Sequence, residues 1–127
     1  MAQPVSVLRL DEPVRFDPVQ LEALCREFGD DGAERIIAQA LEQIAFKVAH
    51  IRALWTAREI DEIAHVCKSL VRVSMHIGMI TLASVTKDVE RCAVAHNITA
   101  LGATIARLER TGDQTVHAIW ALEDVPG

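Results

Sequence analysis

The chain has 127 residues, a formal net charge of −5, and a composition that is 50% hydrophobic but only 4% aromatic. This length fits one domain with a sizeable core and is too short for two. The acidic balance argues against non-specific nucleic-acid binding, which depends on Lys and Arg neutralising phosphates. Because Tyr is absent, the core must come mainly from Leu, Ile, Val and Ala, a composition that suits packed helices.

The amino-terminal residues and the cysteines indicate where the protein resides. Residues 1–16 contain two prolines and no helical period, which predicts an extended arm. Charges and prolines stand where a signal peptide has its apolar core, and no run reaches about 18 apolar residues, so no membrane span is expected. Cys25, Cys67 and Cys92 show no CxxC spacing, which favours reduced thiols in a cytoplasmic protein.

Two helices are predicted in the first half of the chain. Asp17 is an N-cap, Pro18 suits the first helical position, Gln20 would complete a capping box, and Gly29 ends this short capping helix. Asp31 is expected to cap a second, long helix. Its apolar seam recurs at steps of three and four: Ile37, Leu41, Ile44, Val48, Ile51 and Trp55.

A central helix is predicted next, starting from Thr56-Ala57-Arg58-Glu59, which has the pattern of another capping box. Gly78 should end this helix. Because the link to the preceding helix is so short, the two helices must lie antiparallel and side by side. The expected inward residues are Ile60, Ile63, Cys67, Leu70, Ser74 and Ile77.

Two further helices complete the predicted fold. One covers about residues 79–95. Asn97 should cap the other, a long helix with a bend or fraying expected near Gly112. The residues expected to point inward are Leu82, Val85, Val89 and Cys92 in the first, and Ile98, Leu101, Ile105, Leu108, Val116, Ile119 and Leu122 in the second. The predicted fold class is an all-α, antiparallel up-down four-helix bundle over residues 17–124, with a short N-terminal capping helix.

The central helix also carries a polar stripe opposite its apolar one. Counted from the first residue of the stripe, the steps are three, four, seven and eleven, so the side chains share one face. The stripe comprises His65, Lys68, Ser69, Arg72 and His76. Val66, Val73 and Met75 flank it and cannot all reach the core, so this face is a candidate docking surface.

These residues resemble a known family. The run FGDDGAERIIAQALEQIAFKVAHIRALWTAREIDEIAHVCKSL looks like the first two-thirds of a histidine-containing phosphotransfer (HPt) domain. The likeness lies in the A-R-E-I-D connection and in Ala-His-x-x-Lys followed by a small residue. It continues through Ile77-Gly78 and through Val89-Glu90, where the family has Leu-Glu, and covers roughly residues 17–122.

The resemblance implies a phosphorelay protein in which His65 accepts a phosphoryl group from one receiver-domain aspartate and passes it to another. Lys68 would offset the charge of the bound phosphoryl group, and Ser69, Arg72, Val66, Val73 and His76 would contact the partner. An imidazole suits this task because its ordinary pKa of about 6.5 leaves a nucleophilic nitrogen near neutral pH.

The same resemblance implies the partners and cofactors. The expected partners are response-regulator receiver domains, with a hybrid histidine kinase as a further candidate, and neither nucleic acid nor membrane. No cofactor is expected, since the metal would belong to the receiver. The protein would be a phosphocarrier and a monomer, without kinase or ATPase activity of its own.

Two alternatives remain open at this stage. The first is a degenerate HPt-like module that docks receivers or kinases without being phosphorylated. Three departures from the family motivate it: Ser69 replaces the usual Gly, Arg72 replaces a small residue, and the interval from His65 to Gly78 is about one turn longer. The second is a helical scaffold that self-associates through Val66, Val73 and Met75.

Overall fold

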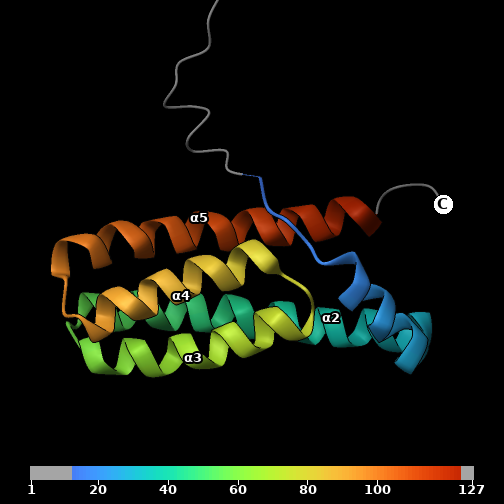
Figure 1. The fold of residues 1–127 in the computed structure, drawn as a ribbon, viewed down its shortest axis with the longest axis horizontal. Helices are drawn as coiled ribbons and strands as arrows, with labels where there is room; N and C mark the ends of the chain where they lie inside the picture. Colours follow the sequence, from blue (N-terminus) through green and yellow to red (C-terminus); the bar gives the residue numbers. More distant parts are fainter. Residues whose placement is uncertain (1–12, 124–127) are drawn as a thin grey trace, which may run out of the picture.

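Four helices form the part of the chain that the structure describes. The computed structural model describes residues 13–123, without the side chains of residues 120, 122 and 123. The helices are α2 (Pro18–Thr56), α3 (Ile60–His76), α4 (Ile80–Val94) and α5 (Ile98–Glu123). They lie alongside one another as an up-down bundle (Figure 1). Between residues 13 and 123 there is no strand, only one isolated antiparallel bridge. The predicted all-α four-helix bundle is confirmed.

The core is aliphatic, as the composition indicated. Its largest fully buried side chains come from all four helices and the turn before α4: Leu24, Ile44, Ile51, Ile63, Leu70, Ile77, Met79, Leu82, Val85, Leu101, Ile105 and Leu108. Ser74, Thr86 and Thr115 are also buried, and each hydroxyl donates a hydrogen bond to the carbonyl four residues earlier. Their polarity therefore costs little, because each buried hydroxyl has a partner.

The start of α2 is capped by Asp17 as predicted, but the Gln20 side chain has a different partner from the predicted one. The Asp17 carboxylate accepts hydrogen bonds from the backbone N–H groups of Val19 and Gln20, at 3.0 and 3.4 Å. The Gln20 side chain does not reach back to complete a capping box. Its Nε2 instead donates to the carbonyl oxygen of His76 at 2.8 Å. That carbonyl lies in the last turn of α3, where no intrahelical partner exists, so tertiary contact redirected the side chain.

A kink at Gly29 divides α2 into two helical segments. Gly29 has φ 75° and ψ 168°, and it alone in α2 departs from helical dihedrals. The predicted end of the short helix at Gly29 is confirmed. The prediction that Asp31 is an N-cap is wrong, because the one glycine both ends the first segment and starts the next. Asp31 already lies in the first turn of the second segment, where a carboxylate suits the helix dipole.

The link from α2 to α3 differs from the predicted capping box. Thr56 belongs to α2 and bonds back to the Arg52 carbonyl, while Glu59 precedes α3 without a side-chain cap. Arg58 takes the left-handed conformation, φ 59°, and the N–H groups of Arg58 and Glu59 donate to the carbonyls of Trp55 and Leu54. These bonds form a Schellman motif. The Arg58 guanidinium stacks 3.9 Å from the Trp55 ring, which offsets part of the cost of a non-glycine there.

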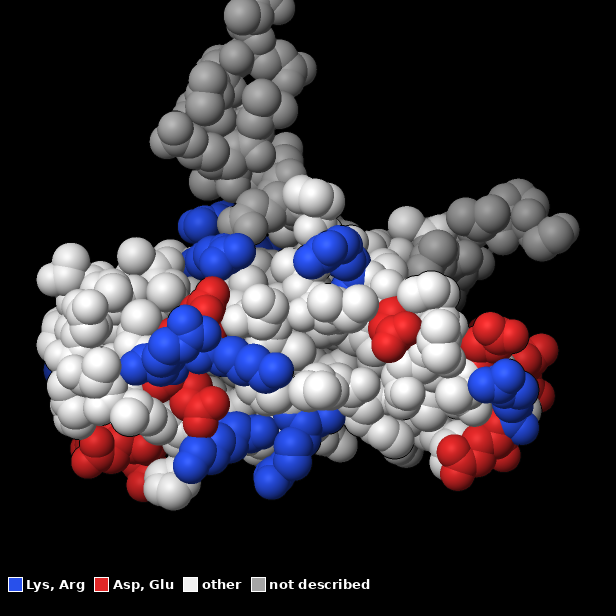
Figure 2. Space-filling view, viewed as in Figure 1, with Lys and Arg blue, Asp and Glu red and all other residues white. Residues whose placement is uncertain are grey.

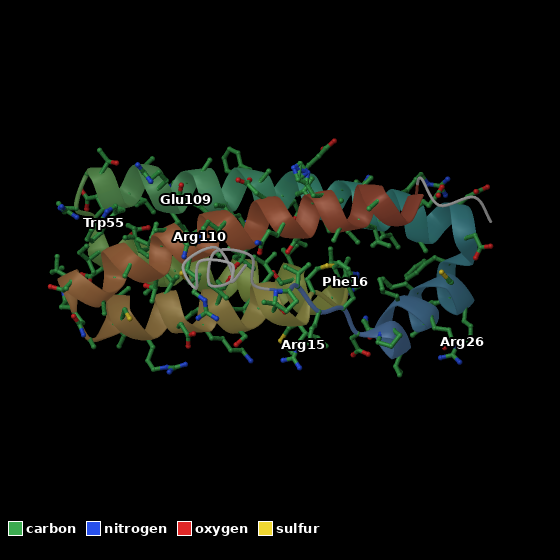
Figure 3. All side chains as sticks on the ribbon, turned by 90° about the horizontal axis from the view of Figure 1, so that it is seen from above. Arg15, Phe16, Arg26, Trp55, Glu109 and Arg110 are labelled. Atoms are coloured by element: carbon green, nitrogen blue, oxygen red, sulfur yellow. The ribbon has the colours of Figure 1, made fainter. Side chains whose placement is uncertain are left out.

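At the far end, an extended segment ties α2 to the turn between α3 and α4. Gly78 ends α3 as predicted, at φ 71°. Its carbonyl accepts from the Asp17 N–H at 2.8 Å, and Phe16 pairs with Met79 in the isolated bridge. Figure 3 shows Arg15 and Phe16 on this segment, well separated along the bundle from Trp55. Residues 1–12 of the predicted arm lie outside the described residues.

The last helix is one long helix, and it continues through Gly112. Asn97 caps it as predicted, with its side-chain oxygen accepting from the Ala100 N–H at 3.2 Å. The inward position predicted for Ile98 is wrong, because this first residue of the helix is 46% exposed beyond the edge of the core. Leu122 lies outside the described side chains. None of the described helices combines the length and the apolar character needed to cross a bilayer.

Candidate functional site

The predicted polar stripe occupies the solvent face of α3. His65, Lys68, Arg72 and His76 are exposed, and Ser69 is half-buried. His65 lies in the second turn of the helix, which starts at Ile60. The stripe therefore exists as one continuous surface along α3.

The imidazole of His65 is exposed and has no partner in the described part of the bundle. Within residues 13–123 its ring makes no hydrogen bond and no salt bridge. One turn earlier, the Asp61 carboxylate is engaged by the His96 ring at 3.1 Å. No carboxylate or carbonyl therefore orients the imidazole of His65, and both ring nitrogens remain available to a partner.

Two cations next to His65 also lack a carboxylate partner. Neither Lys68 nor Arg72 forms a salt bridge to any described residue. Other arginines of the bundle are paired, for example Arg52 with Glu109 at 2.7 Å and Arg91 with Asp88 at 2.9 Å. Because Lys68 and Arg72 are three and seven residues after His65, they stand on the same helix face. The structure thus presents an imidazole with one unpaired cation a turn away and a second about two turns away on the same helix face.

The flanking valines contribute to the packing of the bundle. Val66 and Val73 are half-buried and pack against the core, so they support the bundle in addition to any contact with a partner. Val73 also lines a groove of about 370 Å³ between α3 and α2, whose other walls are Arg72, His76, Ile36, Gln39, Ala40 and Gln43. Met75 is 56% exposed on the opposite flank. A docking role for the two valines stays a prediction.

Phe46 is a surface residue that the sequence interpretation passed over. Its side chain is 71% exposed, and its ring centroid lies 6.2 Å from that of His50. Gln39 and Gln43 line the α2–α3 groove, and Phe46 and His50 follow them by seven residues, so they continue the same flank of α2. The available signal was that Phe46 falls outside the apolar seam of its helix.

The core-facing side of α3 offers no second reactive group close to His65. Cys67 is fully buried. This burial raises the pKa of its thiol to about 12, with a smaller contribution from the negative charge of Glu90. The thiol therefore stays protonated and unreactive at neutral pH. His65 and Cys67 lie on different faces of the helix, and the described residues contain no group of three or more potential metal ligands.

Comparison with known protein families, curated proteins and solved structures found no match to this chain.

Proposed function

We propose that the protein is a histidine phosphotransfer protein that relays a phosphoryl group between receiver-domain aspartates through His65. The observation that supports this most directly is the exposed, unpartnered imidazole with an unpaired Lys68 one turn along the helix. A surface nucleophile with no base of its own suits a protein whose partner supplies the rest of the apparatus.

The reaction needs little from this chain beyond access and charge. A ring nitrogen of His65 attacks the phosphorus of an aspartyl phosphate in line. The N–P bond forms as the bond to the aspartate oxygen breaks, and the receiver regains its carboxylate. The second transfer reverses these steps with another receiver. The metal that neutralises the phosphoryl oxygens would belong to the receiver, and Lys68 would add one positive charge from this side.

The remaining stripe residues are proposed as contacts and not as chemical groups. Arg72 is seven residues from His65, within reach of the rim of a docked domain. His76 is eleven residues away, roughly 16 Å along the helix axis at 1.5 Å per residue. His76 is thus too distant to act on the same phosphoryl group.

The decisive experiment uses two matched histidine substitutions on one helix face. The wild type, His65→Gln and His76→Gln are incubated with a panel of phosphorylated receiver domains, and acid-labile phosphate on each protein is measured. We expect His65→Gln to lose all transfer and His76→Gln to keep it. Circular dichroism should show both variants folded, since an exposed polar exchange typically changes stability by less than about 0.5 kcal/mol.

Two outcomes would contradict the proposal in different ways. Acid-labile phosphate on His65→Gln would mean that another residue is the acceptor. Receiver binding without any phosphorylation of the wild type would instead favour the degenerate docking module.

A further inference from the structure

The distribution of charge on the face shared by α3 and α4 is unusual for this chain. The protein carries 18 acidic and 13 basic residues, yet the sequence from Ile63 to Lys87 contains no Asp or Glu. The same stretch contains Lys68, Arg72 and Lys87, all exposed. Figure 2 shows Lys and Arg side chains over α3 and α4, with Asp and Glu side chains between some of them and at both ends of the molecule.

These three cations, here called the basic belt, are not neutralised within the bundle. None of Lys68, Arg72 and Lys87 forms a salt bridge to a described residue. The carboxylates that follow the stretch are otherwise engaged. Asp88 pairs with Arg91 at 2.9 Å and with Arg107 at 3.4 Å, and Glu90 is half-buried where its charge acts on Cys67.

An apolar pocket adjoins the belt. It has a volume of about 260 Å³ between the end of α3 and the start of α4, and Met75, Met79, Ile80, Ala83 and Lys87 are among its lining residues. Asp17 also lines the pocket, with its carboxylate engaged in capping α2. Met75 and Ile80 are 56% and 43% exposed. Methionine side chains adapt readily to irregular partners. An apolar anchor beside a cationic rim is a common arrangement for a protein contact.

We propose that a partner protein docks on the α3–α4 flank of α3 through an acidic surface that meets the basic belt, with an apolar side chain in the adjacent pocket. Charge complementarity decides between the two flanks. The α2 side of the site carries two exposed acids, Glu42 next to Phe46 and Glu62 on α3, which are balanced by two cations, Lys47 and Arg72. The α3–α4 side offers Lys68 and Lys87. The carboxylates near them are engaged, Asp17 as the cap of α2 and Asp88 in ion pairs. This inference rests on the proposed function in taking the partner to be a receiver domain.

Lys87 and Lys47 provide a matched pair for the test, because they lie on α4 and α2, the helices on either side of α3. Affinities of the wild type, Lys87→Glu and Lys47→Glu for a panel of purified receiver domains are measured at about 25 and 250 mM salt. We expect Lys87→Glu to weaken binding at least tenfold at low salt and to flatten the salt dependence, since attraction between exposed charges is screened by ions. Lys47→Glu should stay within twofold of the wild type.

A second measurement separates docking from chemistry. Phosphoramidate is a small phosphoryl donor that needs no docking surface, so it should label His65 at the same rate in the wild type and in Lys87→Glu. Equal losses of affinity in both lysine variants, or a loss confined to Lys47→Glu, would overturn the assignment of the flank while leaving the proposed function intact. A wild type that binds no receiver at either salt concentration would overturn both.

Discussion

His65 is accessible because of the residues that flank it on α3. Ile63 and Cys67, two positions to either side, are fully buried. Two steps along a helix turn the direction of a side chain by about 200°, so the burial of both neighbours directs His65 away from the core. The spacing alone was sufficient to predict this exposure.

Lys68 can be tested separately from His65. Lys68→Ala is expected to slow single-turnover transfer from a phosphorylated receiver about tenfold, because one charge that attracts the phosphoryl oxygens is lost. Lys68→Arg, which keeps the charge, should stay close to the wild type. The measurement is rapid-quench transfer at saturating receiver. If Lys68→Arg slows transfer as much as Lys68→Ala does, the charge is not what matters.

The raised pKa of Cys67 predicts that the folded protein becomes less stable at alkaline pH. Its pKa is about 12 in the folded protein, against an ordinary value of 9.0. Between these values the unfolded chain loses the thiol proton and the folded chain keeps it, so the contribution of Cys67 to stability is complete below pH 9 and falls as the pH rises toward 12. Urea unfolding at pH 8 and pH 10 should show a larger decrease for the wild type than for Cys67→Ala. Equal decreases in the two proteins would show that Cys67 is not the source of the pH dependence.

At the scale of the elements, some hydrogen bonds at the helix ends follow from the local sequence, and others depend on tertiary packing. Asp17 and Asn97 cap their helices as predicted, because an N-cap needs only nearby backbone N–H groups. Gln20 and Thr56 also fit a local pattern, but the structure gives them other partners. The His76 carbonyl was available to Gln20 only through the packing of α2 against the end of α3, which no spacing in the sequence encodes.

The close contact at the α3–α4 turn makes Gly78 sensitive to substitution. Gly78 has φ 71°, and a Cβ on it would lie 3.1 Å from the Asp17 carbonyl oxygen. Alanine at positive φ costs about 1–2 kcal/mol by itself. Gly78→Ala should therefore destabilise the protein by more than this strain in urea unfolding, because the Asp17 carbonyl must also move. A loss no larger than the strain would show that the segment before α2 moves aside without cost.

At the scale of the whole molecule, the chain contains no Gly-rich phosphate loop or nucleophile elbow. We therefore expect no ATP hydrolysis and no phosphate incorporation from ATP alone. The measurement is incubation of the purified protein with radiolabelled ATP and Mg²⁺, with His65→Gln as the control for acid-labile signal. Incorporation that depends on His65 would show an intrinsic kinase activity and would contradict the description of a passive carrier.

The sequence by itself determined the order of the helices, most of their inward faces, and the polar stripe of α3. These features follow from the period of the apolar residues, which is local and survives in any helical packing. It also predicted that α3 ends at Gly78, because glycine takes the positive φ of a helix C-terminus without a steric penalty. The resemblance to phosphotransfer domains depends on the same local pattern.

Only the tertiary structure decided which neighbours the stripe has. Helix periodicity places Val66 and Val73 beside His65, but whether they face solvent or core depends on how closely α2 approaches α3. The exposure of Phe46 and the pocket between the end of α3 and the start of α4 follow from how the helices pack. Contacts of this kind depend on the register and distance of packed helices, which a one-dimensional pattern does not specify.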